Sequence, residues 1–513
     1  MTRRHLAQPA LALLLALALA CSLLLSSCEE SEKVQKRTSS ISDASIIRAF
    51  EEVLLVPRSG KDYPDRINEY LMRHGKELGL DCKTDKVGNV IMDAPATTGY
   101  EDLPRTLLQV HTDDLVTHEP DIVFDASLDN VDLSVADGVL RGKDTSMGAS
   151  SAFGIASILT ILAHPGSHGP LRAIFTAHAD EDAHGAAGLS KKSLEGNLLI
   201  SFDGLDRSRI LTGAPTATVL TSSTTVAAMQ PEKQHAFVLA AAGFSGGRAD
   251  IGKDAVNGDP IRVVTDILTR ARSAGILIEL CSFQAEADSF DLPKEAVATV
   301  IVGDYEQRML RRIVGEVQRD ARDRYGDAAE GIEVSMIETV PPEASIDNDS
   351  MSTVLAHLYG LLNNNIATSA AKETAALYIS SVDLSPQHFF CSATLYAADP
   401  AEIDTIVTQQ LALEKLTGIP MQASASWTGF RTETEEDTVV QAFLDAADKE
   451  LEGSPEHTVG NKISELGLLH EKAPDLPIVV LGAGITDKGT PAESIEEKGI
   501  ADPANAALSY ILG

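Results

Sequence analysis

The sequence predicts an α/β protein in which helices cover a mostly parallel sheet. Two observations support this fold class. Short apolar runs have the length and the flanking residues of buried strands, at 106–111, 171–177, 198–203 and 476–481. Segments with apolar residues at helical spacing lie between them. In the stretch 148–166, Ile155, Leu159 and Leu162 share one helical face, and Pro165 ends the helix.

The first residues have the pattern of a bacterial lipoprotein signal peptide. A basic start precedes an apolar run at 11–25, and the sequence Leu-Ser-Ser before Cys28 is typical of a cleavage site that leaves a lipidated cysteine. Cys21 is a weaker candidate for lipidation. A membrane helix is the alternative interpretation, but the run is shorter than the ~20 residues that a span needs. Residues 1–28 are therefore expected to be a signal peptide, and the polar residues 29–41 a tether.

This signal predicts a lipid-anchored protein of the bacterial cell envelope, at the outer membrane. The acidic pair Glu29-Glu30 after the lipidated residue favours exposure on the cell surface. The leaflet of attachment stays open at this stage. The formal charge of −33 disfavours a nucleic acid or any anionic surface as a partner, because binding phosphates requires a basic face.

The length of 513 residues exceeds what one hydrophobic core supports, and 44% hydrophobic residues are enough for large cores, so about two domains are expected. The character of the chain changes between 225 and 421, where a long helical segment rich in Arg and Glu spans 307–325. We therefore expect one domain from 42–224 and 422–513, interrupted by an inserted domain at 225–421. The remaining cysteines are too few and too widely spaced for a disulfide framework or a thiolate metal site: Cys82, Cys281 and Cys391.

The most informative stretch is LLQVHTDDL at 107–115, because an apolar strand running into His-x-Asp is how many zinc peptidases begin their metal site. The ends of such strands are also where open α/β sheets bind ligands. Further motifs follow along the chain: TSMGASSAFGIAS, FTAHADEDAHGAAGL, LLISFDG, GFSGGRADIG, ISELGLL and VVLGAGITDKGTPAESI.

In their order and spacing, these motifs resemble those of the aminoacyl-histidine dipeptidases, also called cytosol non-specific dipeptidases, which are di-zinc exopeptidases. The resemblance runs from about Ser42 to the C-terminus. It implies a zinc-exopeptidase-like catalytic domain with a mixed sheet and an inserted α+β lid domain. A homodimer is a further possibility that the sequence leaves open.

The resemblance assigns a metal-ligand role to His111 and to Asp203, and it makes Asp113 the carboxylate that orients the imidazole. The aspartate that bridges the two zinc ions in the family is replaced here by Ser150. A neutral hydroxyl does not offset two divalent cations about 3.5 to 4 Å apart. The resemblance therefore predicts that no paired-metal site forms at this position.

The remaining site positions are also degraded. The alignment puts Ala179 where the family has its general base, and Asp180 where it has a metal ligand. The lid histidine is replaced by Phe244, and the last zinc-binding histidine by Gly489. A one-residue shift in the alignment would place Asp180 and Glu181 at the base and ligand positions and restore both roles.

A rebuilt metal site is a second alternative, because His178 and His184 flank the Asp180 position. The acidic run 180–182 is expected to be a solvated turn, with a weak calcium-type site as the alternative.

Together, these residues predict a dipeptidase-like pseudoenzyme that holds no zinc or holds it weakly, and that binds a peptide or protein. An active but atypical dipeptidase acting on Xaa-His or other dipeptides is the alternative. A purely structural role of the lid surface is the third hypothesis.

Overall fold

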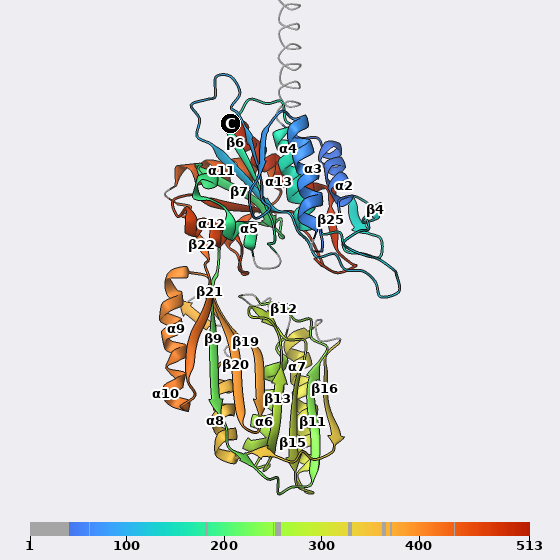
Figure 1. Cartoon of the computed structure of the whole chain (residues 1–513), viewed down its shortest axis with the longest axis vertical. Helices are drawn as coiled ribbons and strands as arrows, with labels where there is room; N and C mark the ends of the chain where they lie inside the picture. The colour runs from blue at the N-terminus through green and yellow to red at the C-terminus, as the bar shows by residue number, and fades with distance from the viewer. Residues whose placement is uncertain are drawn as a thin grey trace, which may run out of the picture. The chain divides into compact units, whose positions relative to one another are not determined.

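The computed structural model describes residues 40–513 apart from 61, 180–182, 250, 252–257, 327–330, 362–365, 370–371 and 436. The expected signal peptide, Cys28 and nearly all of the tether lie outside this part of the chain, as do Asp180 and Glu181. Within the described residues, no helix is long and apolar enough to cross a membrane. The chain forms two compact units, drawn in Figure 1.

The first unit comprises the residues up to Leu211, Glu433–His457 and Ala473–Gly513. Its sheet has the order β1-β2-β6-β3-β7-β24-β8. The four central strands are parallel, and the strands next to them, β2 and β8, are antiparallel to them, so the sheet is mixed as expected. The strand bounds are β1 (Asp81–Thr84), β2 (Val90–Ala94), β3 (Thr106–His111), β6 (Leu171–Thr176), β7 (Leu198–Gly204), β8 (Arg209–Ala214) and β24 (Ile478–Gly482).

The central strands β3, β6 and β24 are buried along their whole length, as continuous apolar runs of a parallel sheet should be, and in β7 all residues but Asp203 are buried. The most buried helix of this unit is α4 (Ala149–Leu162), in which Thr160 alone is not buried. The other helical segments of the unit are α2 (Asp43–Leu54), α3 (Tyr63–Glu77), α5 (His184–Gly188), η1 (Lys191–Leu194), α11 (Thr438–Glu450) and α13 (Glu497–Leu512). A small antiparallel sheet joins β4 (Leu133–Ala136), β5 (Val139–Gly142) and β25 (Ser494–Glu496).

The second unit comprises Thr212–Thr432 and Thr458–Lys472. Its large sheet has the order β16-β11-β15-β13-β19-β20-β9-β21, with β18 beside β19, and every pairing in it is antiparallel. The strand bounds are β9 (Thr216–Thr225), β11 (His235–Ala242), β13 (Glu279–Ala285), β15 (Ala296–Val302), β16 (Glu333–Thr339), β18 (Ile366–Ser369), β19 (Lys372–Ser385), β20 (His388–Ala397) and β21 (Met421–Trp427).

The helices α6, α7 and α8 lie together on one face of this sheet (Figure 1). Their bounds and those of the other helical segments are α6 (Pro260–Ser273), α7 (Gln307–Tyr325), α8 (Asn348–Leu361), η3 (Pro400–Glu402), α9 (Ile403–Leu411), α10 (Leu413–Thr417) and α12 (Leu466–Lys472). Short ladders add β10 (Ala228–Met229) with β17 (Ser345–Ile346), and β12 (Gly247–Arg248) with β14 (Asp291–Leu292); β22 (Phe430–Arg431) and β23 (Glu456–Val459) pair with β8.

The structural boundaries of the inserted unit differ from the expected 225 and 421. Strands β9 and β21 pair with each other inside the sheet of the second unit, so that unit extends outward to 212 and 432. The segment 458–472, expected in the first domain, also belongs to the second unit. The reason is long-range pairing: Ile251 donates its backbone N–H to the carbonyl of Asn461 at 2.9 Å, a contact that no local pattern reveals.

Candidate functional site

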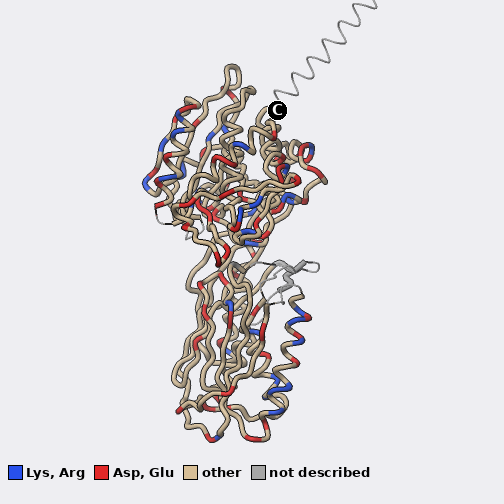
Figure 2. The backbone as a smooth tube through the Cα atoms, turned by 90° about the vertical axis from the view of Figure 1, so that its right-hand side faces the viewer, with Lys and Arg blue, Asp and Glu red and all other residues tan. Residues whose placement is uncertain are grey.

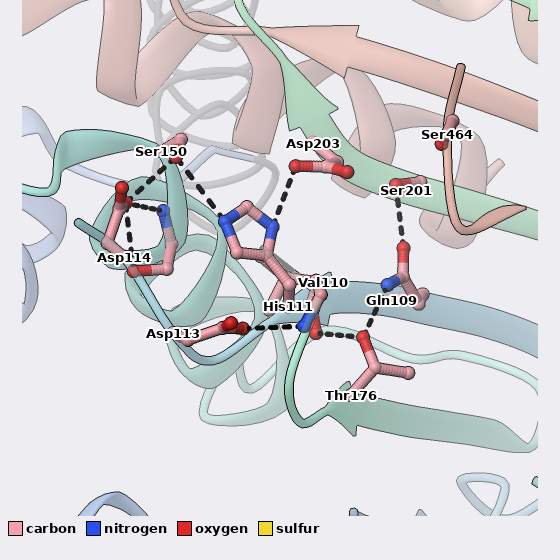
Figure 3. A network of polar contacts seen from close by, with 12 residues as sticks. Gln109, Val110, His111, Asp113, Asp114, Ser150, Thr176, Ser201, Asp203 and Ser464 are labelled. Carbon is pink, nitrogen blue, oxygen red and sulfur yellow. Dashed lines mark hydrogen bonds and ion pairs between the residues drawn. The ribbon is translucent and has the colours of Figure 1, made fainter. Parts of the chain in front are cut away.

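His111 and Asp203 meet at the carboxyl edge of the first unit's sheet. The parallel register pairs Gln109 of β3 with Ser201 of β7, and two residues later these strands reach His111 and Asp203. Alternate residues of a strand share a face, so the later pair lies on the same side as the earlier one. His111 Nδ1 is 2.7 Å from Asp203 Oδ1 (Figure 3), well below the ~10 Å beyond which two side chains could not bind one ion.

The hydroxyl of Ser150, the second residue of α4, lies on the other side of the imidazole. Ser150 Oγ is 3.4 Å from His111 Nε2 and donates to Asp114 Oδ2 at 2.8 Å (Figure 3). A serine hydroxyl has one hydrogen, and an ionised carboxylate only accepts, so that hydrogen belongs to Asp114. Each ring nitrogen of His111 therefore has a protein oxygen as its neighbour.

Asp114 is the residue of this site that the sequence did not indicate. Besides Ser150, its Oδ2 accepts the backbone N–H of Ser151 at 3.1 Å and the hydroxyl of Ser151 at 3.2 Å. Burial acts to raise the pKa of Asp114, but the charges of Lys488 and His111 outweigh it and keep this pKa below its usual value. A buried carboxylate thus supplies the negative charge beside Ser150 that the family's bridging aspartate would supply at position 150 itself.

Two further buried charges hold the start of α4 in place. The carboxylate of Glu493 accepts the backbone N–H groups of Met147, Gly148 and Ala149 at 2.6, 3.1 and 3.2 Å. These are the N–H groups at the start of a helix that lack helical partners. Burial raises the pKa of Glu493, as does the nearby charge of Asp114.

Arg58 is the second buried charge at the start of α4. Its Nη2 donates to the carbonyl of Gly148 at 2.9 Å, and its Nε donates to Ser151 Oγ at 3.0 Å. Gly148 has a φ of 63°, and a Cβ there would lie 2.9 Å from Asp114 Cβ, so only glycine fits between these groups. Nothing in the sequence marked Arg58, whereas Glu493 lies inside the motif TPAESI, where its acidic side chain was a detectable signal.

Ser150, His111 and Asp203 follow one another as the groups of a serine-hydrolase triad do, but their surroundings do not support that chemistry. The hydrogen of Ser150 is directed to Asp114 rather than to the imidazole. The Ser150 side chain is 1% exposed, so a substrate carbonyl does not reach its oxygen. The backbone N–H groups beside it are already bound to the carboxylates of Glu493 and Asp114, which leaves no oxyanion hole there.

The other predicted site positions lie as follows. The backbone N–H of Ala179 donates to Asp113 Oδ1 at 3.0 Å, and Ala179 has no side chain that takes a proton. Gly489 contributes only its carbonyl, which accepts the hydroxyl of Thr117 at 2.7 Å. Asp113 thus holds the turn at Ala179. Oxygen atoms of Asp203 and Ser150 lie next to the ring nitrogens of His111.

The two additional histidines do not form a metal cluster among the described residues. His178 has a φ of 57°, and its ring lies 5.4 Å from that of Tyr63 and 6.5 Å from that of His184. Within the part of the chain that the structure describes, no three His, Cys, Asp or Glu side chains are grouped to hold a metal ion. The donor set at 111, 150, 203 and 489 therefore does not fit the paired zinc site that the family resemblance implies.

Phe244, at the position of the family's lid histidine, belongs to the hydrophobic core of the second unit. Its side chain is 5% exposed, and its ring packs edge-on against Tyr325 at 6.0 Å. Among the described residues, three cysteines are free thiols; Cys281 and Cys391 are buried and Cys82 is partly buried.

Comparison with known proteins places this site in a family context. No protein-family model matches the chain. The cytosol non-specific dipeptidase of Escherichia coli (strain K12) is 22% identical over 452 residues, which cover 87% of this chain and 92% of the E. coli protein. The aminoacylhistidine dipeptidase of Vibrio alginolyticus has a similar structure, with a TM-score of 0.73, 20% identity, and coverage of 92% and 98% of the two chains.

The aminopeptidase PepT of Bacillus cereus is a further structural match, with a TM-score of 0.56 and 16% identity over 92% of this chain and 98% of that one. The α/β fold with a mixed sheet and a second sheet-and-helix unit is thereby confirmed, and so is the resemblance on which the site positions were assigned.

Proposed function

We propose that this relative of the cytosol non-specific dipeptidases is a pseudoenzyme, which keeps the dipeptidase fold to bind a peptide or a protein without hydrolysing it. The observation that carries the proposal is the neutral Ser150 hydroxyl, which is directed to Asp114 at the position where the family has a bridging carboxylate.

The chemistry of the substituted positions supports this proposal. Hydrolysis by two metal ions needs a carboxylate between the ions and a base for the attacking water. Ser150 is neutral, Ala179 takes no proton, and Gly489 has no side chain. Loss of a general base alone lowers a rate by roughly 10² to 10⁴. These roles are coupled, so their losses are not multiplied, but no single reversion is expected to restore turnover.

A hydrolysis assay tests the catalytic half of the proposal. The purified full-length chain, prepared without chelators, is incubated with Xaa-His and other dipeptides and with added zinc, manganese or cobalt. We expect no metal-dependent cleavage, and less than one bound zinc per chain by mass spectrometry of the metal content. Cleavage that His111→Ala abolishes and His118→Ala leaves intact would instead establish an active, atypical dipeptidase. His118 is a suitable control because its exposed ring bonds only locally, at the carbonyl of Glu119.

Equilibrium dialysis with labelled dipeptides and tripeptides tests the binding half. Saturable binding that excess unlabelled peptide displaces, with the peptide recovered uncleaved, is the expected result. Absence of binding to every peptide, and to proteins of the cell envelope in a crosslinking assay, would favour a structural role for the lid surface.

The membrane attachment is part of the same proposal. We expect Cys28 to carry the lipid, and Cys28→Ser to move the protein into the soluble fraction or to leave an unprocessed precursor. Detergent partitioning and the mass of the N-terminal peptide measure this. Attachment that persists in Cys28→Ser with the signal uncleaved would indicate a membrane helix instead, and Cys21→Ser is the matched control.

A further inference from the structure

A cavity of about 610 Å³ lies among the helices of the second unit. Residues from α6, α7 and α8 line it, and the lining is dominated by charged side chains: Arg262, Asp266, Arg270, Arg272 and Arg324, with Tyr359 at 61% exposure. Its size lies in the range of sites for small molecules, which is roughly 300 to 1,000 Å³.

The charge of the cavity is opposite to that of the protein as a whole. The full chain carries a formal charge of −33, yet four arginines and a single aspartate line this space. In Figure 2, several positively charged positions, in blue, follow one another along a helix of the second unit. Arg262, Asp266 and Arg270 recur every four residues, which puts them on one face of α6.

Two of the arginines are held in place by contacts between helices. Arg270 Nη1 is 2.6 Å from Asp320 Oδ2 of α7, and Arg272 Nη2 donates to Ser352 Oγ of α8 at 2.8 Å. Each contact uses one nitrogen of a group that has five N–H donors, so both guanidinium groups keep donors for a ligand. Asp266 lines the cavity and Asp320 pairs with Arg270, so the four arginines outnumber these two carboxylates.

We propose that this cavity binds a small ligand through a phosphate group. A guanidinium group is a rigid fork of donors that matches phosphate oxygens, and a tetrahedral phosphate accepts such forks from several directions at once. A carboxylate offers one flat edge and pairs well with one arginine. Arg262 and Arg270 of α6, together with Arg324 of α7, approach the cavity from two helices, which is the arrangement that a tetrahedral anion uses.

The phosphate group has two possible sources, a soluble metabolite or the headgroup of a lipid, and the experiment separates them. In the first arm, pyrophosphate is titrated into the purified full-length chain by calorimetry at fixed ionic strength. In the second arm, the chain is floated with neutral vesicles with and without added phosphatidylglycerol, so that the expected lipid anchor contributes equally to both. Binding in the first arm identifies a soluble ligand, and a gain that occurs only with phosphatidylglycerol identifies a headgroup.

Two charge-matched double variants give the decisive contrast. Arg262→Gln with Arg324→Gln should weaken binding roughly tenfold or more, because the pair loses two of the four guanidinium groups that line the cavity. Arg308→Gln with Arg319→Gln removes the same charge from exposed positions of α7 outside the cavity and should leave the affinity within about twofold. Circular dichroism confirms that both variants fold. No binding in either arm, or equal losses in the two variants, would overturn the proposal.

Discussion

His111 in the first unit and His357 in the second are both buried, and they differ in what surrounds them. His111 has carboxylates on both sides, Asp203 directly and Asp114 through Ser150. The ring nitrogens of His357 face hydroxyl groups, those of Ser222 at 2.9 Å and Thr417 at 3.1 Å, and its ring packs edge-on against Phe389 at 5.9 Å. Burial of an imidazole alone therefore does not identify a functional site. The charges around the imidazole distinguish the candidate site at His111 from the core position of His357.

This contrast extends to protonation. Burial lowers the pKa of His357 to about 4, since no neighbouring charge offsets the loss of water. In the first unit, several buried charges of both signs compensate one another around Asp114, including the guanidinium of Arg58. The following substitutions change either the charged groups around Asp114 or the imidazole of His357.

The largest effect is expected from Arg58→Ala. The substitution removes the buried guanidinium charge beside Asp114 and Glu493, together with its hydrogen bonds to the carbonyls of Val53 and Gly148. Breaking such a buried arrangement costs about 3 to 5 kcal/mol. Chemical denaturation of the full chain measures the loss of unfolding free energy. Arg270→Ala, which removes a half-exposed arginine, is the control and should cost less than about 1 kcal/mol. Equal losses would mean that the first unit does not depend on charge compensation.

The pH dependence of the second unit is expected to be next in size. The folded-state pKa of His357, about 4, lies below the unfolded value near 6.5, so the unfolded chain binds the proton first as the pH falls. The contribution of this group to stability is present above pH 6.5 and is lost between about 6.5 and 4. The loss amounts to roughly 2 to 3 kcal/mol.

Denaturation of the wild-type chain and of His357→Gln between pH 7.5 and 4 tests this expectation. Glutamine keeps polar contacts for Ser222 and Thr417 but does not titrate, so the variant should have a flatter pH profile for the unfolding of the second unit. A profile identical to that of wild type would assign the pH dependence to other groups. Unfolding is followed by the fluorescence of Trp427, which lies in the second unit.

The smallest effect is expected from Ser150→Asp. It adds a carboxylate next to Asp114 and removes the hydroxyl that donates to it, which should lower the unfolding free energy by about 1 to 3 kcal/mol. Added zinc should recover part of this loss, because a third ligand then joins His111 and Asp203. Thermal unfolding with and without zinc measures both effects. Ser151→Asp, one residue along α4, is the matched control and should show no zinc-dependent gain. If neither variant responds to zinc, His111 and Asp203 no longer function as a ligand pair.

The sequence by itself determined individual strands and helices, and it showed which residues stand at the positions matched to the family's site. The apolar run at 106–111 corresponds to β3, and the helical region expected around 307–325 corresponds to α7. These elements depend on side chains that are neighbours in sequence, where a pattern is visible. The residues Ser150, Ala179 and Gly489 were equally visible, because motif order and spacing matched them to site positions of the family.

Only the tertiary structure decided which side chains surround Ser150 and the start of α4. Arg58 and Glu493 reach the start of α4 from 90 and 345 residues away, measured to Gly148, and Asp114 reaches Ser150 across 36 residues. The pairing of β9 with β21 moved the unit boundary for the same reason. The arginines of the second unit also gather from helices that are far apart in the chain. Contacts of this kind leave no periodic signal in a sequence, because they depend on how the elements pack rather than on how neighbouring residues alternate.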